Sequence, residues 1–322
     1  MKKFGLAMTA MLLAVSMTAC ASNPSDSGEQ KLRIGIIQPA ERGALDSARE
    51  GFVDALADHG YVDGETIEID YQNAQGDSSA LLTISQRFVG DDCDLVLAIG
   101  TGAAQSIASQ TSEIPVLITA VTDPVDAGLV QSNEEPGTNV TGTNDMNPIR
   151  EQMELIREFL PDVQTVGLLY TSSEDNSVLQ IQEVKAVLEE MNVGYVEQTV
   201  TGSNDVQQAV QSILGKCDAL YIPTDNTLAA SAALVGSAAQ TAKIPVFWGE
   251  GNCVAEGGLA SLGLDYYNLG RQTGEMAVEV LEGADPAVMP IQSQSDYSYT
   301  ISKSMAEEIG IEIPAHLLEF AE

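Results

Sequence analysis

Short apolar runs alternate with amphipathic segments along most of the chain. The runs are rich in Ile, Val and Leu and lack strict polar alternation, as expected of strands that are covered on both faces. They lie at residues 33–37, 66–71, 94–100, 114–120, 165–170, 219–223 and 244–249. Because the intervening segments have a helical pattern, the chain is predicted to form parallel sheets with right-handed crossovers.

Two of the amphipathic segments have clear helix signals. Residues 47–60 place their apolar side chains on one stripe and begin with a Ser47/Glu50 capping box. Residues 177–194 repeat this pattern, and a glycine closes each segment where a helix is expected to end. Both segments are therefore predicted to be helices that cover a sheet.

The same order of elements occurs twice. The first copy contains the segments 33–38, 93–106 and 113–130, and the second contains the matching segments 165–170, 217–231 and 243–260. We therefore predict an α/β fold of two doubly wound parallel-sheet lobes. The predicted division gives 31–145 plus about 264–286 to the first lobe and 146–263 plus about 287–322 to the second. Several chain crossings between the lobes are expected to act as a hinge.

The tail after residue 263 is too short for a third domain. It contains a predicted helix at 266–283, and a predicted strand followed by a helix at 297–311. We expect this tail to return and cover both lobes.

The N-terminus has the pattern of a secretory signal. Lys2 and Lys3 precede an apolar run at 4–15, and the run is too short for a comfortable membrane span. The following "MTAC" resembles a bacterial lipobox, which implies a signal peptide at 1–19 and lipidation of Cys20. The alternative is an ordinary cleaved signal with an incidental cysteine. The small, polar residues 20–30 are expected to form a flexible tether that holds the protein outside the cytoplasm.

The charge balance excludes some partners. The 14 basic and 47 acidic residues give a formal net charge of −33, which repels nucleic acid and anionic lipid. Apart from Cys20, the cysteines are Cys93, Cys217 and Cys253, an odd number that cannot form a complete disulfide framework. We interpret them as small core residues, and no metal or cofactor is expected.

Polar residues gather where the predicted strands end, which is where open parallel sheets bind ligands. In the first lobe, "GTGAAQ" (100–105) leads directly into a helix, so backbone N–H groups at Thr101, Gly102 and Ala103 suit a carboxylate or phosphate. An ordinary helix cap is the alternative. In the second lobe, Asp225 and Glu250 occupy matching positions. An anion site opposite an acid site fits a zwitterion, meaning an amino acid.

Three candidate residues of the second lobe, Asp225, Trp248 and Tyr170, each have two interpretations. Asp225 is also placed to cap the helix that begins near residue 227. Trp248 and Tyr170 follow or end apolar strands, so each is either a core residue or a flat wall for a ligand. Enzyme signatures are absent, since His59 and His316 accompany no nucleophile motif and no HExxH, GxSxG or Walker sequence occurs.

Several motifs together resemble the substrate-binding lipoproteins of ABC importers, in the group associated with aromatic amino acids such as tryptophan and tyrosine. They are "ALDSAREGF" (44–52), "IDYQNAQGD" (69–77), "TAVTDPVDAGLV" (119–130), "NVTGTND" (139–145), "LYIPTDN" (220–226) and "LDYYNLGRQTGEMA" (264–277). The resemblance implies a type I periplasmic-binding fold with three crossovers between its lobes.

The resemblance also implies which positions face the ligand. With the strand-end residues above, the candidate ligand-binding residues are Thr101, Gly102, Ala103, Thr122, Asp123, Tyr170, Ser172, Asp225, Asn226, Trp248 and Glu250. Two places depart from the family pattern. Arg42 and Gly43 stand where a His-Pro pair is common and are expected at the cleft lip, and Gly102 stands where proline is common.

The sequence therefore predicts a lipid-anchored receptor, expected to be a monomer and not an enzyme. It would capture an amino acid, aromatic by resemblance, and deliver it to an ABC permease in the membrane. A sensory binding protein that presents its closed form to a membrane kinase or chemoreceptor is the alternative. A cytoplasmic repressor with the same lobes would need an N-terminal DNA-binding helix pair, and this chain has a signal segment there instead.

Overall fold

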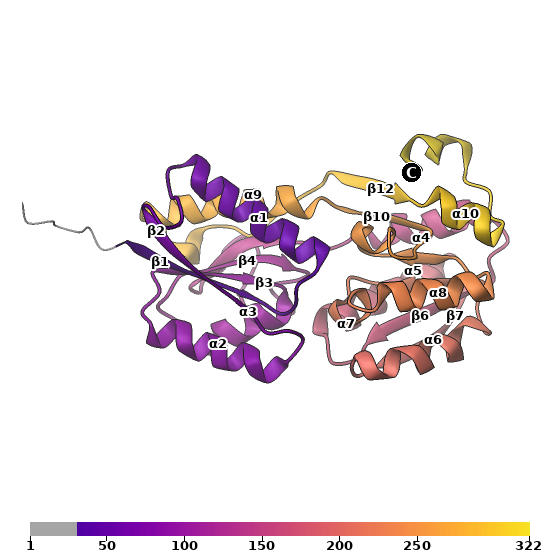
Figure 1. The fold of residues 1–322 in the computed structure, drawn as a ribbon, viewed down its shortest axis with the longest axis horizontal. Coiled ribbons are helices and arrows are strands. Elements are labelled where there is room, and N and C mark those ends of the chain that lie inside the picture. Colours follow the sequence, from indigo (N-terminus) through magenta and orange to yellow (C-terminus); the bar gives the residue numbers. More distant parts are fainter. Residues whose placement is uncertain (1–30) are drawn as a thin grey trace, which may run out of the picture. The chain divides into compact units, whose positions relative to one another are not determined.

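The computed structural model describes residues 31–322, which form two six-stranded sheets flanked by helices (Figure 1). The predicted signal peptide at 1–19, the tether at 20–30 and the lipidation site Cys20 lie outside the described residues. Within 31–322, each sheet and its helices make up one lobe.

The first sheet is parallel throughout, with the strand order β2-β1-β3-β4-β5-β11. Its strands are β1 (Leu32–Gln38), β2 (Ile67–Asn73), β3 (Leu95–Ile99), β4 (Val116–Val121), β5 (Val140–Asn144) and β11 (Gln292–Ser293). Its helices are α1 (Gly43–Asp58), α2 (Ser78–Gly90), α3 (Thr101–Ala108) and α9 (Tyr266–Leu281). Strand β3 is buried along its whole length because helices cover both faces.

The second sheet repeats this plan in the order β7-β6-β8-β9-β10-β12, and only β12 runs antiparallel to its neighbour. Its strands are β6 (Thr165–Thr171), β7 (Gly194–Val200), β8 (Ala219–Ile222), β9 (Val246–Trp248), β10 (Ala260–Leu264) and β12 (Tyr297–Ile301). Its helices are α4 (Ile149–Phe159), α5 (Asp175–Glu190), α6 (Val206–Leu214), α7 (Asn226–Ala229), α8 (Ala232–Ala242) and α10 (Lys303–Ile309).

The predicted fold class is confirmed, and every strand that the sequence predicted is present. Cys93 and Cys217 are buried in the apolar layers of the two lobes, as predicted for small core residues. Cys253 is also buried, and all three thiols are free.

Two helix boundaries differ from the sequence prediction. Helix α1 begins at Gly43 with Arg42 as its N-cap, so the predicted Ser47/Glu50 capping box is wrong. The Ser47 hydroxyl lies inside the helix and donates to the Gly43 carbonyl at 2.7 Å. Helix α5 ends at Glu190, before the predicted stop at Gly194.

The described chain crosses between the lobes three times, from β5 to α4, from β10 to α9 and from β11 to β12. The C-terminal tail contributes a strand to each sheet, and Figure 1 shows the yellow strand β12 beside β10. Because Gln292–Ser293 pairs with β5, the last crossing falls between Ser293 and Tyr297 rather than near residue 287.

Helices α1 and α9 pack along each other at unusually short range (Figure 1). A Cβ atom on Gly270 would lie 1.9 Å from the Ala48 carbonyl oxygen, and one on Gly51 would lie 2.0 Å from the Tyr267 carbonyl oxygen. Glycine at both positions therefore allows the two backbones to touch. This contact fixes the start of α1 relative to the start of α9.

We predict that Gly270→Ala will destabilise the protein by about 1–3 kcal/mol, because an added methyl overpacks a rigid helix contact. Gly90→Ala is the matched control, since Gly90 also lies in a helix and a Cβ there would meet nothing within 4 Å. Urea unfolding of the two variants measures the difference. If the two variants unfold at the same urea concentration, the α1–α9 contact accommodates the added methyl group without loss of stability.

Candidate ligand-binding site

Polar side chains from both lobes converge at the carboxyl ends of the parallel strands. Each follows a different strand: Arg42 follows β1, Thr122 follows β4, Asp145 follows β5, Glu174 follows β6, Asn226 follows β8 and Glu250 follows β9. Parallel strands present all of these loops at one edge of each sheet, which is where such sheets bind ligands.

Arg42 links the two lobes. Its Nη2 donates to Asn226 Oδ1 at 2.9 Å, and its Nη1 lies 3.5 Å from Glu250 Oε2. The side chains of Arg42 and Glu250 are only 4% and 3% exposed, so this ion pair is screened little by water. On its other side, Glu250 Oε1 accepts a weak hydrogen bond from the Cys253 thiol at 3.7 Å.

Glu174 holds Asn226 in place. One carboxylate oxygen accepts from the Asn226 backbone and side-chain amides, both at 2.8 Å. The other accepts from the Thr227 backbone amide at 2.9 Å and from its hydroxyl at 2.8 Å. With four donors, the Glu174 carboxylate is fully used within the second lobe and presents Asn226 to Arg42.

Asp145 is the second buried carboxylate of the cluster. The Tyr266 hydroxyl, at the start of α9, donates to Asp145 Oδ2 at 2.8 Å. Burial raises the pKa of Asp145 to about 6, and the negative charge of Glu250 adds to this rise. The hydrogen bond from Tyr266, the nearby hydroxyl of Thr122 and the positive charge of Arg42 oppose it.

The cluster contains more acid than base. Two fully buried carboxylates, Asp145 and Glu250, face one guanidinium. Several buried atoms in it have no hydrogen-bond partner: Asp145 Oδ1, Glu250 Oε2, Arg42 Nε, Arg42 Nη1 and Thr101 Oγ1. Unpaired buried polar atoms cost free energy, so a site with this composition suits a ligand that supplies both a cation and an anion.

Thr101 and Thr122 reach this region through local backbone features. Thr101 is the first residue of α3, after Gly100, whose φ of 87° turns the chain from β3 into the helix. Strand β4 has a register shift between Ile118 and Val121, and Ala120 has a φ of 55°. Such a bulge redirects the following residue, which is Thr122.

A cavity of about 450 Å³ adjoins the cluster and is lined by both lobes. Thr101, Glu174 and Asn226 belong to its lining as well as to the cluster or its support. Pro39, Leu81 and Gly102 line it from the first lobe, and Thr201, Thr227 and Ala230 line it from the second. The cavity therefore offers room for a side chain beside the buried charges.

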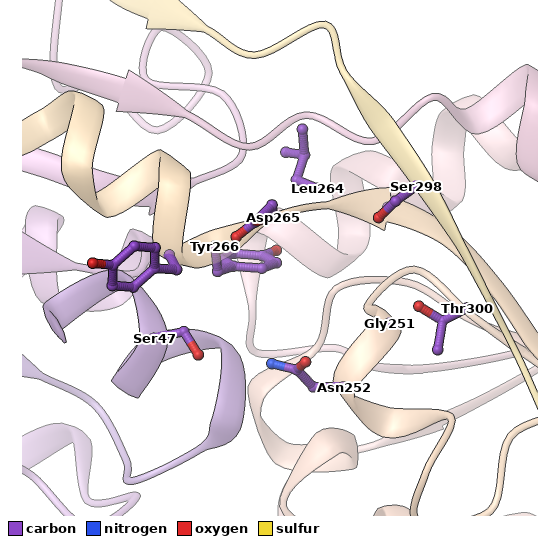
Figure 2. Close-up of a pocket in the computed structure, with 10 residues that line it drawn as sticks. Ser47, Gly251, Asn252, Leu264, Asp265, Tyr266, Ser298 and Thr300 are labelled. Atoms are coloured by element: carbon purple, nitrogen blue, oxygen red, sulfur yellow. The ribbon is translucent and has the colours of Figure 1, made fainter. Parts of the chain in front are cut away.

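A second, smaller cavity of about 200 Å³ lies at the crossing from β10 to α9. Figure 2 shows its lining, with Ser47 of α1, Asn252 of the second lobe, Asp265 and Tyr266 of the crossing, and Thr300 of β12. It contains none of the unpartnered atoms of the charged cluster. The cavity of about 450 Å³, which Thr101 lines, is therefore the candidate ligand cavity.

Asp225 lies within the second lobe, where its carboxylate accepts four hydrogen bonds. The donors are the Thr171 amide at 2.6 Å, the Thr171 hydroxyl at 2.8 Å, the Ser177 hydroxyl at 2.9 Å and the Leu228 amide at 2.8 Å. Burial raises the pKa of Asp225, and the negative charge of Glu174 adds to this rise, while the hydrogen bonds from Leu228 and Thr171 oppose it. The geometry is that of a helix cap, which was the alternative interpretation.

The two candidate aromatic walls make their contacts within the second lobe. Trp248 is buried in the apolar layer of the second lobe, where a Cβ on Gly258 would come within 2.5 Å of its ring. The Tyr170 hydroxyl donates to Glu197 on β7 at 3.0 Å. Both side chains therefore belong to the body of the lobe.

Of the remaining candidates, some have only local structural contacts and one lines the candidate cavity. Asp123 accepts from the Val125 and Asp126 amides at 2.9 and 3.0 Å, which closes a turn. Ser172 is exposed and donates to the Val200 carbonyl. Gly102 lines the larger cavity, whereas Ala103 is fully buried in the helix packing.

Three members of the cluster or its support were absent from the predicted site: Asp145, Glu174 and Tyr266. Asp145 and Tyr266 lie within motifs that carried the family resemblance, and Glu174 lies in a strand-end loop, so each had a weak signal. Arg42 was expected at the cleft lip, and the structure places it inside. Nothing in the local sequence indicates that these residues meet.

Comparison with known protein families shows which family the chain belongs to. The family model described as "ABC transporter substrate binding protein" matches residues 33–322, which is nearly all of the described chain. The chain belongs to this family. It is therefore a substrate-binding protein of ABC transport and not an enzyme.

Individual relatives agree with this assignment. The substrate-binding protein is 39% identical to a tyrosine-binding protein of Clostridioides difficile, over 97% of its own length and 93% of that protein. It is 40% identical to a protein of Streptococcus pneumoniae solved in complex with L-Trp, with a TM-score of 0.88 over 90% of this chain and 98% of that one.

A third relative shows a different arrangement. The ligand-free, open structure of a substrate-binding protein from Clostridium difficile is 43% identical and covers 88% of this chain and 96% of that one, yet its TM-score is only 0.69. Since the sequence identities are nearly equal, the higher score for the L-Trp complex indicates that the lobes of the present structure are arranged more as in that complex.

More distant solute-binding proteins establish the fold. At 12% and 15% identity they still give TM-scores of 0.60 and 0.62, which shows the type I periplasmic-binding fold. Within residues 31–322, every helix is too short or too polar to span a bilayer. The same residues contain no group of three or more His, Cys, Asp or Glu that is placed to bind a metal.

We predict that Asp145 makes the ligand-free protein less stable as the pH rises from about 4 to 6. Its pKa of about 6 in the folded state lies above the ordinary value of 3.8, so the folded state binds the proton more tightly. Asp145→Asn removes this titration and should raise stability at pH 7 by roughly 1–3 kcal/mol. Urea unfolding at several pH values measures it.

Asp126→Asn, on an exposed loop of the same lobe, is the control and should follow the wild-type pH profile. If the free energies of unfolding of wild type and Asp145→Asn change in parallel between pH 4 and 7, the Asp145 carboxyl does not have the raised pKa described above.

Proposed function

We propose that this substrate-binding protein captures an aromatic amino acid between its lobes and delivers it to an ABC importer. One observation carries the proposal: the buried cluster has an excess of carboxylate charge and unpartnered donors within the same site. A zwitterion supplies a cation for the carboxylates and an anion for the unpartnered donors. A sugar supplies neither charge.

The ammonium group is placed at the two buried carboxylates. Asp145 Oδ1 and Glu250 Oε2 have no hydrogen-bond partner, and they come from different lobes. Asp225 is left out of this role because all of its hydrogen bonds are made within the second lobe. The ligand carboxylate is placed on the first lobe, where the Thr101 hydroxyl is unpartnered at the start of α3.

The side chain of the ligand is placed in the cavity of about 450 Å³. Gly102 has no side chain there, and Pro39 and Leu81 give the wall apolar surface. This room suits a large ring. The relatives that bind tyrosine by name, or L-Trp in a crystal, support an aromatic side chain at 39–40% identity.

Delivery follows from closure of the lobes. A ligand that touches Asp145 on one lobe and Glu250 on the other makes its full set of contacts only when the lobes are closed. It therefore shifts the hinge equilibrium toward the closed form. The importer distinguishes loaded from empty protein by this form.

We further propose that the protein acts outside the cytoplasm, held at the membrane by lipid on Cys20. The support is the basic, apolar and small-residue order of residues 1–19 and the family to which the chain belongs. A tether at 20–30 would leave the lobes free to close.

We predict that L-Trp, L-Tyr or L-Phe binds the purified protein with micromolar or better affinity, which corresponds to about −8 kcal/mol or more. Glu250→Gln should raise Kd by about 10- to 100-fold, because the ammonium loses a charged acceptor in a buried site. Isothermal titration calorimetry measures both.

Glu256→Gln is the matched control, because Glu256 is exposed in the same loop region. It should bind as the wild type does. Stabilisation by sugars alone, with no response to any amino acid, would refute the proposed function.

We also predict that the full-length protein, expressed in a bacterium, is recovered with the membrane fraction and carries a lipid at Cys20. Cys20→Ser should move it to the soluble fraction, because lipid attachment requires the thiol. Fractionation followed by mass spectrometry of the N-terminal peptide measures this. An unmodified Cys20 in a membrane-bound protein would contradict the lipid anchor.

A further inference from the structure

Arg42 belongs to the first lobe, but its polar contacts lie on the second. Arg42 is the N-cap residue of α1, which packs on α9, and its side chain makes no capping hydrogen bond to the helix. Its guanidinium reaches Asn226 and Glu250 across the cleft. Among the buried side chains of residues 31–322, Arg42 is the one lysine or arginine.

Two of its three guanidinium nitrogens are available to a ligand. Nη2 donates to Asn226, whereas Nε and Nη1 have no hydrogen-bond partner. Nη1 is within ion-pair distance of Glu250, at 3.5 Å, but makes no hydrogen bond to it. Nη2 donates only one of its two hydrogens to Asn226, so its second hydrogen, together with either Nε or Nη1, forms a planar edge that matches the two oxygens of a carboxylate.

The second lobe fixes the orientation of this guanidinium. Glu174 accepts from both amides of Asn226 at 2.8 Å, and Asn226 Oδ1 then accepts from Arg42. This support leaves Arg42 little rotational freedom once the lobes are closed. The free donors are therefore preorganised before a ligand carboxylate arrives, which reduces the entropy cost of binding.

We propose that Arg42 binds the α-carboxylate of the captured amino acid and restricts capture to ligands in which that carboxylate is free. This inference rests on the proposed function and deepens it, since it names the chemical group that selects the ligand. Thr101 is neutral and contributes one hydroxyl, so it complements Arg42 and does not replace its charge. Amino-acid amides, esters and decarboxylated amines leave the guanidinium unpaired.

The charge of the protein makes the test stringent. Tryptophanamide retains the ammonium group and the ring but is a net cation, and the chain has a net charge of −33. Long-range attraction therefore favours the amide over the zwitterion. Preference for the free acid has to come from a contact with its carboxylate.

The experiment compares L-Trp with L-tryptophanamide by isothermal titration calorimetry. In the wild type we expect Kd for the amide to exceed Kd for the acid by about 100-fold or more. In Arg42→Gln this ratio should fall to about 5-fold or less, mainly through weaker binding of the acid. Arg42→Lys keeps the charge without the planar donors and should give an intermediate ratio.

Arg49→Gln is the matched control, because Arg49 lies on the same helix and pairs with Asp46 at 3.5 Å. It should keep the wild-type ratio. The ratio is measured within each variant, so it does not depend on how much Arg42→Gln alters folding stability, and circular dichroism of each ligand-free variant checks the fold.

The outcomes separate the two proposals. If Arg42→Gln keeps the wild-type ratio, the carboxylate is held elsewhere and the role of Arg42 is overturned, while capture of an amino acid stands. If the wild type binds both compounds equally, the requirement for a free carboxylate is likewise overturned. If it binds neither, the aromatic ligand of the proposed function fails, and this inference fails with it.

Discussion

The structure depends on a buried imbalance of charge between its lobes. Two carboxylates, Asp145 and Glu250, are buried beside one guanidinium, that of Arg42. Removing an ion from water costs several kcal/mol unless a partner compensates it, so the closed cleft without a ligand is under strain from its own groups. In the proposed function, the ammonium group of the ligand relieves that strain. Binding and closure would then be two descriptions of one free-energy change.

The packing of the helices explains how so few groups can be placed so closely. Arg42 stands at the start of α1, and Tyr266, which holds Asp145, stands at the start of α9. These helices touch through Gly51 and Gly270, so their N-termini move as one body. Tyr266 also follows the crossing from β10. The first-lobe half of the site is thus tied to the hinge through a rigid contact.

Sequence reasoning was sufficient for the fold because each local pattern agreed with the global one. Apolar runs without alternation predicted strands that are covered on both faces, and the internal repeat predicted two lobes. It was less successful for boundaries such as the start of α1. Residues 38–42 contain no Ser, Thr, Asn or Asp, and the apparent capping box at Ser47 placed the predicted N-cap five residues after the observed one, Arg42.

The site was predicted only in part, because similar sequence signals have different fates in three dimensions. Asp225 and Glu250 both follow strands of the second lobe. Asp225 is followed by the α7 turn and accepts from its Leu228 amide, whereas Glu250 precedes a short 3₁₀ turn that its side chain does not cap. Glu250 is therefore left to face the cleft. Such a difference is set by neighbouring donors and not by spacing.

The surface charge and the buried charge have separate consequences. Exposed acidic residues act on a ligand through water and salt, which screen them beyond about 8 Å at physiological ionic strength. They influence approach, and a zwitterion with no net charge responds to them weakly. Asp145, Glu250 and Arg42 act in a region from which water is largely excluded, where electrostatic interactions are stronger. In the proposed function, selection between solutes therefore rests on three buried side chains, although the sequence as a whole has far more charge on its surface.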